Sequence, residues 1–152
     1  MEKIFETFSE IETQKLGENL GRHLGAGDFV AMKGDLGVGK TAFTKGIARG
    51  MGITDDVTSP TFTIINEYDG ETRLSHIDTY RLEKPEELED IGFSEYLSDY
   101  VVVMEWADRV KGLLPRDVLW VCFETLGDHR RRLRFKSSTK YYDDKLWELS
   151  KV

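Results

Sequence analysis

One stretch decides the fold class: FVAMKGDLGVGKT, residues 29–41. Residues 29–32 form a short apolar run that predicts a buried strand. Residues 34–41 match the pattern G-x-x-x-x-G-K-[ST], and residues 42–51 favour a helix closed by Gly50 and Gly52. A strand, a glycine-rich turn and a helix in this order are typical of a phosphate-binding loop, or P-loop.

Each part of this loop suits the binding of a phosphate chain. Glycines let backbone N–H groups approach phosphate oxygens closely, and the helix that follows presents its positive N-terminus to the anion. Lys40 is placed to reach the β and γ phosphates, and Thr41 to offer its hydroxyl to Mg²⁺. With ATP and Mg²⁺ as the expected ligands, the predicted cofactor-binding residues of the loop are Gly34, Leu36, Gly37, Val38, Gly39, Lys40, Thr41 and Ala42.

Two carboxylates follow predicted strands and are candidates for the magnesium side of the site. Glu105 comes directly after the fully apolar run 100–104, and Asp78 follows the weaker strand pattern 74–77. A P-loop site needs a carboxylate at the carboxyl end of a neighbouring buried strand. We expect one of the two to hold the metal and the other to orient the attacking water. A helix cap or a surface salt bridge is the alternative for each.

Three further groups of residues are candidates with open alternatives. Ser59-Pro60-Thr61-Phe62 is either a switch loop, with Thr61 sensing the γ-phosphate, or a simple turn. His76, two residues before Asp78, is expected to be a half-buried structural residue, and Trp106 to lie in the core or beside the nucleotide. In the run 130–134, Arg130 and Arg132 share one strand face, either in a charged edge or in a basic strip for nucleotide or partner.

The rest of the chain predicts one α/β domain over residues 1–152. A helix is expected from Ser9 to about Gly25, followed by the P-loop unit. Two hairpins are predicted, one that pairs 62–68 with 72–77 and one that pairs 117–124 with 130–136. Short helices are expected between them at 85–90 and 93–97. Residues 141–152 (139–152 at most) predict a short helix or tail. The expected architecture is P-loop NTPase-like, with a mixed, mostly parallel sheet between helices and antiparallel hairpins.

Composition narrows the classes of partner and compartment. The chain has 21 basic and 28 acidic residues, and its net charge of −7 argues against direct binding of tRNA or DNA. No apolar run approaches the roughly 18 residues of a membrane helix, and the first residues do not resemble a signal peptide, so a cytoplasmic protein is expected. Cys122 lies in an apolar run and is the only cysteine. A single cysteine excludes an internal disulfide and argues against structural zinc.

Four motifs taken together resemble one family. Gly-Asp-Leu-Gly-Val-Gly-Lys-Thr at 34–41, Ser-Pro-Thr-Phe at 59–62, His-Ile-Asp-Thr-Tyr-Arg-Leu at 76–82 and Glu-Trp at 105–106 resemble the TsaE (YjeE) family, over roughly residues 9–135. The resemblance implies that Thr41 and Glu105 bind Mg²⁺, that Asp78 is needed for hydrolysis, and that Thr13 approaches the adenine. The family's Glu-Trp is often followed by proline, whereas Ala107 follows here.

The same resemblance implies a function in tRNA modification. Members of the family are bacterial ATPases of tRNA threonylcarbamoyladenosine (t6A) synthesis that dock on a complex of TsaD and TsaB and support its repeated turnover. ATP hydrolysis is expected to be weak without these partners, and tRNA is expected to be reached only through the complex.

Three other classes of protein also use a P-loop and are alternatives to this function. A small GTPase would need an N-K-x-D guanine-reading motif and a D-x-x-G motif, and the sequence contains neither. A small-molecule P-loop kinase is the stronger rival, although such enzymes usually carry an arginine-bearing lid, and the arginine cluster here lies in a predicted hairpin. A nucleotide-gated binding module, in which ATP occupancy is the signal, is the third.

Overall fold

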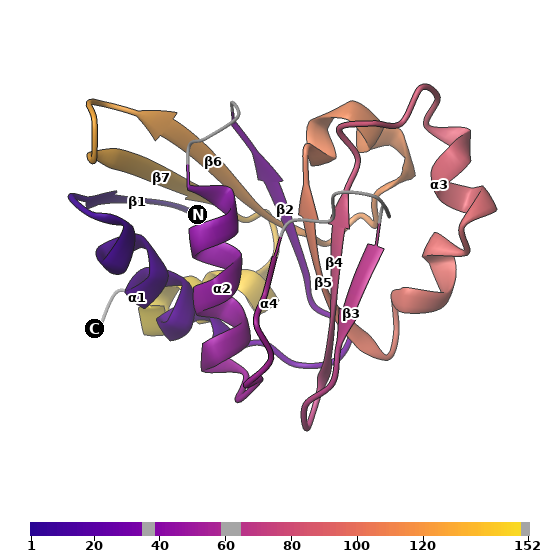
Figure 1. Ribbon diagram of the computed structural model, residues 1–152, viewed down its shortest axis with the longest axis horizontal. Coiled ribbons are helices and arrows are strands. Elements are labelled where there is room, and N and C mark those ends of the chain that lie inside the picture. The colour runs from indigo at the N-terminus through magenta and orange to yellow at the C-terminus, as the bar shows by residue number, and fades with distance from the viewer. Residues whose placement is uncertain (35–38, 59–64, 150–152) are drawn as a thin grey trace.

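A mixed sheet is the frame of the protein (Figure 1). Within residues 1–34, 39–58 and 65–149, which the computed structural model describes, seven strands form one sheet in the order β1-β7-β6-β2-β5-β4-β3. The strands β6, β2, β5 and β4 run parallel to one another, and β7 and β3 pair antiparallel with their neighbours. The predicted mixed, mostly parallel sheet is thereby confirmed. The strand bounds are β1 (Glu2–Thr7), β2 (Phe29–Lys33), β3 (Ile65–Tyr68), β4 (Arg73–Asp78), β5 (Tyr100–Glu105), β6 (Leu119–Thr125) and β7 (Arg131–Lys136).

Helices cover both faces of this sheet. Their bounds are α1 (Glu10–Gly21), α2 (Lys40–Gly50), α3 (Glu86–Asp90) and α4 (Lys140–Leu149), with 3₁₀ helices η1 (Phe93–Tyr96) and η2 (Ala107–Leu113). Ser9 caps α1 as expected, because its hydroxyl accepts a hydrogen bond of 3.1 Å from the backbone N–H of Glu12. In Figure 1, α1 and α2 lie side by side, and α3 lies beyond the β3 edge of the sheet.

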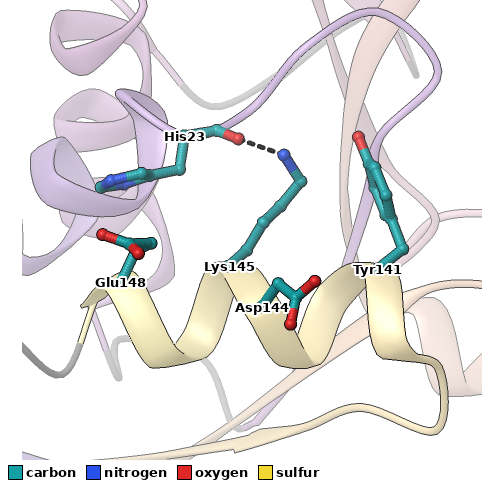
Figure 2. Close-up of a pocket in the computed structure, with 5 residues that line it drawn as sticks. All are labelled: His23, Tyr141, Asp144, Lys145 and Glu148. Atoms are coloured by element: carbon teal, nitrogen blue, oxygen red, sulfur yellow. Dashed lines mark hydrogen bonds between the residues drawn. The ribbon is translucent and has the colours of Figure 1, made fainter.

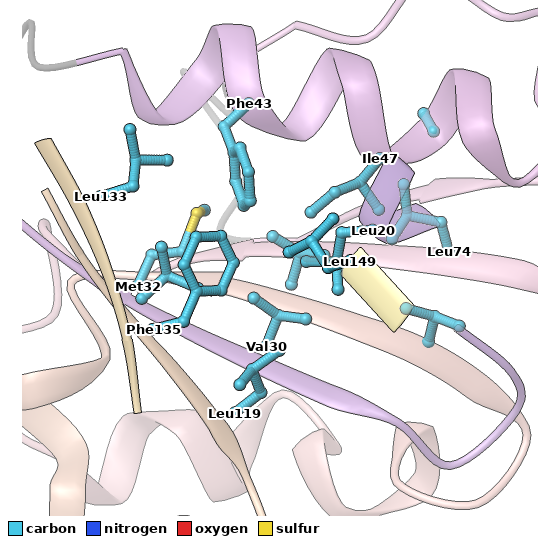
Figure 3. Packing of buried hydrophobic residues seen from close by; sticks show 14 of the residues in the cluster. Leu20, Val30, Met32, Phe43, Ile47, Leu74, Leu119, Leu133, Phe135 and Leu149 are labelled. Atoms are coloured by element: carbon cyan, nitrogen blue, oxygen red, sulfur yellow. The ribbon is translucent and has the colours of Figure 1, made fainter. Parts of the chain in front are cut away.

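The alternation of side chains along the parallel strands separates two hydrophobic cores. On one face, Val30 and Met32 of β2 pack with Phe43 and Ile47 of α2, and Leu149 of α4 joins them (Figure 3). On the other face, residues of β2, β5 and β4 pack with α3, η1 and η2; these include Phe29, Ala31, Ile77, Leu88, Phe93, Met104 and Val110. The central strands are therefore buried on both sides, which explains their continuous apolar sequence.

Four glycines allow α1 and α2 to approach at backbone distance. Gly17 and Gly21 of α1 face α2, and Gly46 and Gly50 of α2 face α1. A Cβ atom added to any of the four would lie 2.0–2.3 Å from a carbonyl oxygen of the opposite helix, well inside an ordinary contact distance. The crossing of these two helices consequently depends on residues without side chains.

Helix α4 is anchored to the amino end of β2. The Tyr142 hydroxyl accepts a hydrogen bond of 2.7 Å from the backbone N–H of Phe29. The buried carboxylate of Asp28 accepts one of 2.5 Å from the Tyr141 hydroxyl, and Lys145 lies 3.5 Å from its other oxygen. These contacts and the burial of Leu146 make α4 an integral part of the fold.

The structure differs from the sequence predictions in a few boundaries. The strand β1 was not predicted, and it pairs antiparallel with β7, so that the sheet extends beyond the second predicted hairpin. The P-loop helix begins at Lys40 rather than at Ala42, and the predicted C-terminal element is a helix over Lys140–Leu149. Among the described residues, no helix is long and apolar enough to cross a membrane.

Candidate functional site

The carboxyl ends of three adjacent parallel strands meet at one edge of the sheet. β2 leads into the glycine-rich segment, its neighbour β5 ends at Glu105, and the next strand, β4, ends at Asp78. In the sheet register Asp78 lies directly opposite Glu105. Ligands of open α/β sheets bind outside such strand ends, so the predicted carboxylates and the predicted P-loop belong to one place in the fold.

Lys40 links the start of α2 to the end of β5. The residue is almost fully buried. Its ammonium group donates a hydrogen bond of 2.8 Å to the Gly34 carbonyl and lies 3.8 Å from the centre of the Trp106 ring. Gly34 and Gly39 have φ angles of 149° and 92°, which only glycine adopts readily. Leu36, Gly37 and Val38 lie outside the described residues, as does Thr61.

Trp106 has an unusual backbone conformation that its surroundings stabilise. Its φ angle is 59°, a left-handed conformation that is rare for a bulky residue. The Thr79 hydroxyl lies 2.7 Å from the Trp106 carbonyl and 3.2 Å from the Glu105 carbonyl, within reach to donate to both. The ring of Tyr80 packs against the indole with 5.0 Å between centroids. Backbone strain of this kind clusters at functional sites, and here the strained residue is the one whose indole lies beside Lys40.

Arg109 of η2 stabilises the turn that follows β4. Its guanidinium donates hydrogen bonds to the carbonyls of Tyr80 and Leu82, the latter at 3.0 Å. The sequence prediction missed this residue and Thr79, because a side chain that binds backbone carbonyls of a distant segment produces no recognisable sequence motif. The side chain of Trp106 lies beside Lys40, and its predicted place beside the nucleotide stays a prediction.

The two carboxylates differ in their environment. Burial raises the pKa of Asp78, and the nearby charge of Glu105 adds to this rise, while the hydrogen bond from the Tyr80 backbone N–H opposes it. That hydrogen bond is 2.8 Å long. Glu105 is buried and lies 2.5 Å from Nε2 of His76. His76 is therefore not half-buried as predicted; it is fully enclosed and contacts a candidate metal ligand.

Thr13 lies next to the P-loop at the start of α1. Its hydroxyl shares a 2.7 Å hydrogen bond with the Thr7 hydroxyl and lies 3.3 Å from the Ser9 carbonyl. Its methyl group lies 3.8 Å from the position that a Cβ atom would take on Gly39. The structure thus brings Thr13 to the loop, with its methyl group toward Gly39.

Arg130 and Arg132 are paired with acidic side chains of the neighbouring strands. Glu6 of β1 lies 2.7 Å from Arg130 and 3.2 Å from Arg132, and Glu124 of β6 lies 3.4 Å from Arg132. Leu133 packs in the α2 core, so by alternation Arg132 lies on the opposite face of the sheet from α2. β7 pairs with β1 on one side and β6 on the other, so the prediction of a charged sheet edge is wrong, and a nucleotide or partner role for these arginines stays a prediction.

The residues at the strand ends fit magnesium in their donor chemistry. Mg²⁺ prefers oxygen ligands and is usually held by one or two carboxylates together with substrate phosphates. Glu105, Asp78 and the Thr41 hydroxyl supply such oxygens near Lys40. Within the described part of the chain there is no cluster of three or more His, Cys, Asp or Glu side chains suited to a metal.

A separate pocket lies at the other end of β2, between α4 and the end of α1 (Figure 2). It measures about 320 Å³ and is lined by His23, Tyr141, Asp144, Lys145 and Glu148. Lys145 points toward the His23 carbonyl and donates a hydrogen bond to it, as the dashed line in Figure 2 shows. Because the Lys145 ammonium already binds this carbonyl and lies beside Asp28, we interpret the pocket as part of the contact that holds α4 against the rest of the protein.

The sheet order, the glycine-rich sequence after β2 and the helix α2 that follows it define a P-loop NTPase-like protein. Comparison with known proteins narrows this class to a family. A sequence model of the family described as "Threonylcarbamoyl adenosine biosynthesis protein TsaE" matches residues 7–133. The chain belongs to the TsaE family.

Individual relatives agree over most of the chain. The TsaE protein of Bacillus subtilis is 41% identical over 147 residues, covering 95% of this chain and 92% of the relative. The Treponema pallidum TsaE protein is 40% identical over 123 residues, covering 80% and 91%. The crystal structure of Bacillus subtilis YdiB superimposes with a TM-score of 0.86 at 35% identity, over 99% of this chain and 95% of that one.

Proposed function

We propose that the protein binds ATP with Mg²⁺ and hydrolyses it as an accessory ATPase of tRNA threonylcarbamoyladenosine synthesis, docking on TsaD and TsaB. One observation carries the catalytic part of this proposal. The Lys40 ammonium, at the start of the P-loop helix, lies 3.8 Å from the ring of Trp106, the residue directly after Glu105. The predicted phosphate-binding lysine and the predicted metal carboxylate therefore share one site.

Each side chain has a distinct role in the proposed reaction. Lys40 binds the β and γ phosphates, and Thr41 and Glu105 hold Mg²⁺, which when bound offsets the negative charge of those phosphates. Water attacks the γ-phosphorus, the bond to the bridging oxygen of ADP breaks, and Asp78 orients the water and accepts its proton. The raised pKa of Asp78 makes its carboxylate a stronger proton acceptor than an exposed aspartate.

Thr13 is proposed to contact the adenine through its methyl group. Its hydroxyl is already shared with Thr7 and Ser9, so an apolar contact is what this side chain has to offer. Thr61 is proposed to sense the γ-phosphate, because it lies in the Ser-Pro-Thr-Phe motif. The chain's acidic balance supports a function in which tRNA is bound by partner proteins.

Phosphate release in the presence of Mg²⁺ tests the activity and its dependence on partners. We expect slow ATP turnover by the isolated protein and faster turnover after addition of TsaB and TsaD. Turnover that does not respond to these partners would contradict the accessory role. Transfer of phosphate to an added small molecule instead of water would favour the rival kinase function.

Replacement of Asp78 by alanine tests the assignment of roles within the site. The variant should still bind ATP, because Lys40 and the loop are intact, and should lose hydrolysis by on the order of 100-fold or more. Asp90→Ala, which removes an exposed carboxylate on α3, is the matched control and should hydrolyse ATP normally. Normal hydrolysis by the Asp78 variant would refute the proposed role of this residue.

A further inference from the structure

His76 is a buried polar residue whose presence the hydrophobic core does not explain. Its side chain is fully buried, and its Nε2 atom lies 2.5 Å from Oε2 of Glu105. Its other ring nitrogen, Nδ1, has no hydrogen-bond partner among the described residues. A buried nitrogen without a partner destabilises the folded state, and an aliphatic side chain of similar size would avoid that cost. The contact with Glu105 is therefore the feature that calls for an imidazole.

The sheet places His76 two residue pairs before the two carboxylates along β4 and β5. In the parallel register of β4 and β5, His76 lies opposite Val103, and Asp78 lies opposite Glu105. The side chains of His76, Asp78 and Glu105 share the sheet face that α2 covers, because Leu74 and Val103 of the same alternation pack in the α2 core. From this position the ring contacts Oε2 of Glu105, and Oε1 is the carboxylate oxygen that it does not contact.

We propose that His76 is a positioning residue that orients the Glu105 carboxylate for binding Mg²⁺. The inference rests on the proposed function, in which Glu105 is a magnesium ligand. Carboxylates that bind metals are commonly held by hydrogen bonds from a second group, and loss of that group typically weakens metal binding about 10- to 100-fold. Nε2 faces the Glu105 oxygen while Nδ1 has no hydrogen-bond partner among the described residues, so Nε2 is the ring nitrogen placed to donate to the carboxylate.

Two substitutions separate a donor role from simple filling of space. His76→Gln keeps an amide N–H group near the position of Nε2, whereas His76→Leu fills a similar volume without a donor. A third variant, His76→Asn, has the same amide on a shorter side chain that ends near the position of Nδ1, short of Glu105. Ser75→Ala is the matched control, because Ser75 is the buried neighbour on β4 and points to the other face of the sheet.

The experiment is a Mg²⁺ titration of each variant in the presence of a non-hydrolysable ATP analogue, with binding measured by calorimetry. Binding of the analogue without Mg²⁺ and the thermal midpoint without ligand are measured in parallel. We expect His76→Leu to need about 10- to 100-fold more Mg²⁺, with unchanged binding of the Mg²⁺-free analogue. His76→Gln should recover most of the loss, and Ser75→Ala should match the parent protein.

Several results would overturn the proposal. A parent-like Mg²⁺ midpoint for His76→Leu would do so, as would equal weakening by His76→Leu and His76→Gln. If His76→Leu does not fold, the comparison of His76→Gln with His76→Asn decides, since the proposal requires the glutamine variant to bind Mg²⁺ more tightly.

Glu105→Gln distinguishes a failure of this inference from a failure of the proposed function. An unchanged Mg²⁺ response in Glu105→Gln would mean that Glu105 is not a ligand, and both proposals would fall. A weakened response in Glu105→Gln together with a normal response in His76→Leu would remove only the positioning role of His76.

Discussion

Replacing Gly46 by alanine should destabilise the protein, because the crossing of α1 and α2 leaves no space for a methyl group. The added Cβ would lie 2.0 Å from the Gln14 carbonyl oxygen, whereas ordinary van der Waals contact begins at 3.4 Å. The Cβ atom is fixed directly to the backbone of α2, and the carbonyl oxygen belongs to the backbone of α1, so the overlap cannot be relieved by rotating a side chain. The two helices would have to move apart, and Phe43 and Ile47 on α2 would lose contacts in the core.

The size of the effect follows from two opposing contributions. Alanine in place of glycine inside a helix stabilises by about 1 kcal/mol. Overpacking costs about 1–3 kcal/mol, and a clash between two backbones belongs at the upper end of that range. The net loss should therefore be about 2 kcal/mol, which for a chain of this length lowers the melting temperature by about 4–8 °C.

Thermal unfolding followed by circular dichroism measures this loss, and urea unfolding gives the free energy. Gly112→Ala in η2 is the matched control, since a Cβ atom there would have nothing within 4 Å and the melting temperature should hardly change. A Gly46→Ala protein as stable as its parent would refute the reasoning, because it would show that the helices separate without cost.

Two further predictions concern pairs of elements that are distant in sequence. Glu6→Gln should destabilise the protein near neutral pH, because Arg130 and Arg132 hold the pKa of the Glu6 carboxyl below its usual 4.5. That contribution to stability is present above the unfolded-state pKa and is lost as the pH falls through the folded-state pKa. The free energies of unfolding of the two proteins, measured with urea, should therefore become equal in acid. A difference in unfolding free energy that does not change with pH would contradict the ion pairs. Tyr142→Phe should cost about 1–3 kcal/mol in urea unfolding, since the buried N–H of Phe29 loses its acceptor, and an unchanged free energy of unfolding would show that α4 does not depend on this bond.

Local sequence patterns were sufficient to predict the strand and the helix on either side of the glycine-rich segment and the strands that carry Asp78 and Glu105. Each of these features is encoded within a few residues, as in the apolar run before Glu105 or the glycines of residues 34–39. The pairing of strands is not local. That Asp78 lies opposite Glu105 depends on the register between β4 and β5, which the sequence patterns left undetermined.

The features that the sequence prediction missed depend on contacts across the fold. β1 is a short edge strand with three charged residues, and its pairing with β7 joins segments more than a hundred residues apart. The left-handed conformation of Trp106 is held by Thr79 and packing against Tyr80, in place of the glycine that would have marked it in the sequence. The complete burial of His76 likewise arises from its position in a central strand beside β5.

The anchoring of α4 has a practical consequence for anyone who shortens this protein. The region matched by the family model ends at residue 133, which would suggest a natural place to cut. A fragment trimmed there would lose Tyr142, Leu146 and Leu149 from the core that α2 shares, and would leave the N–H of Phe29 without its partner. The strand so exposed is β2, whose far end begins the P-loop, so trimming at a distance from the site should impair expression, solubility and nucleotide binding together.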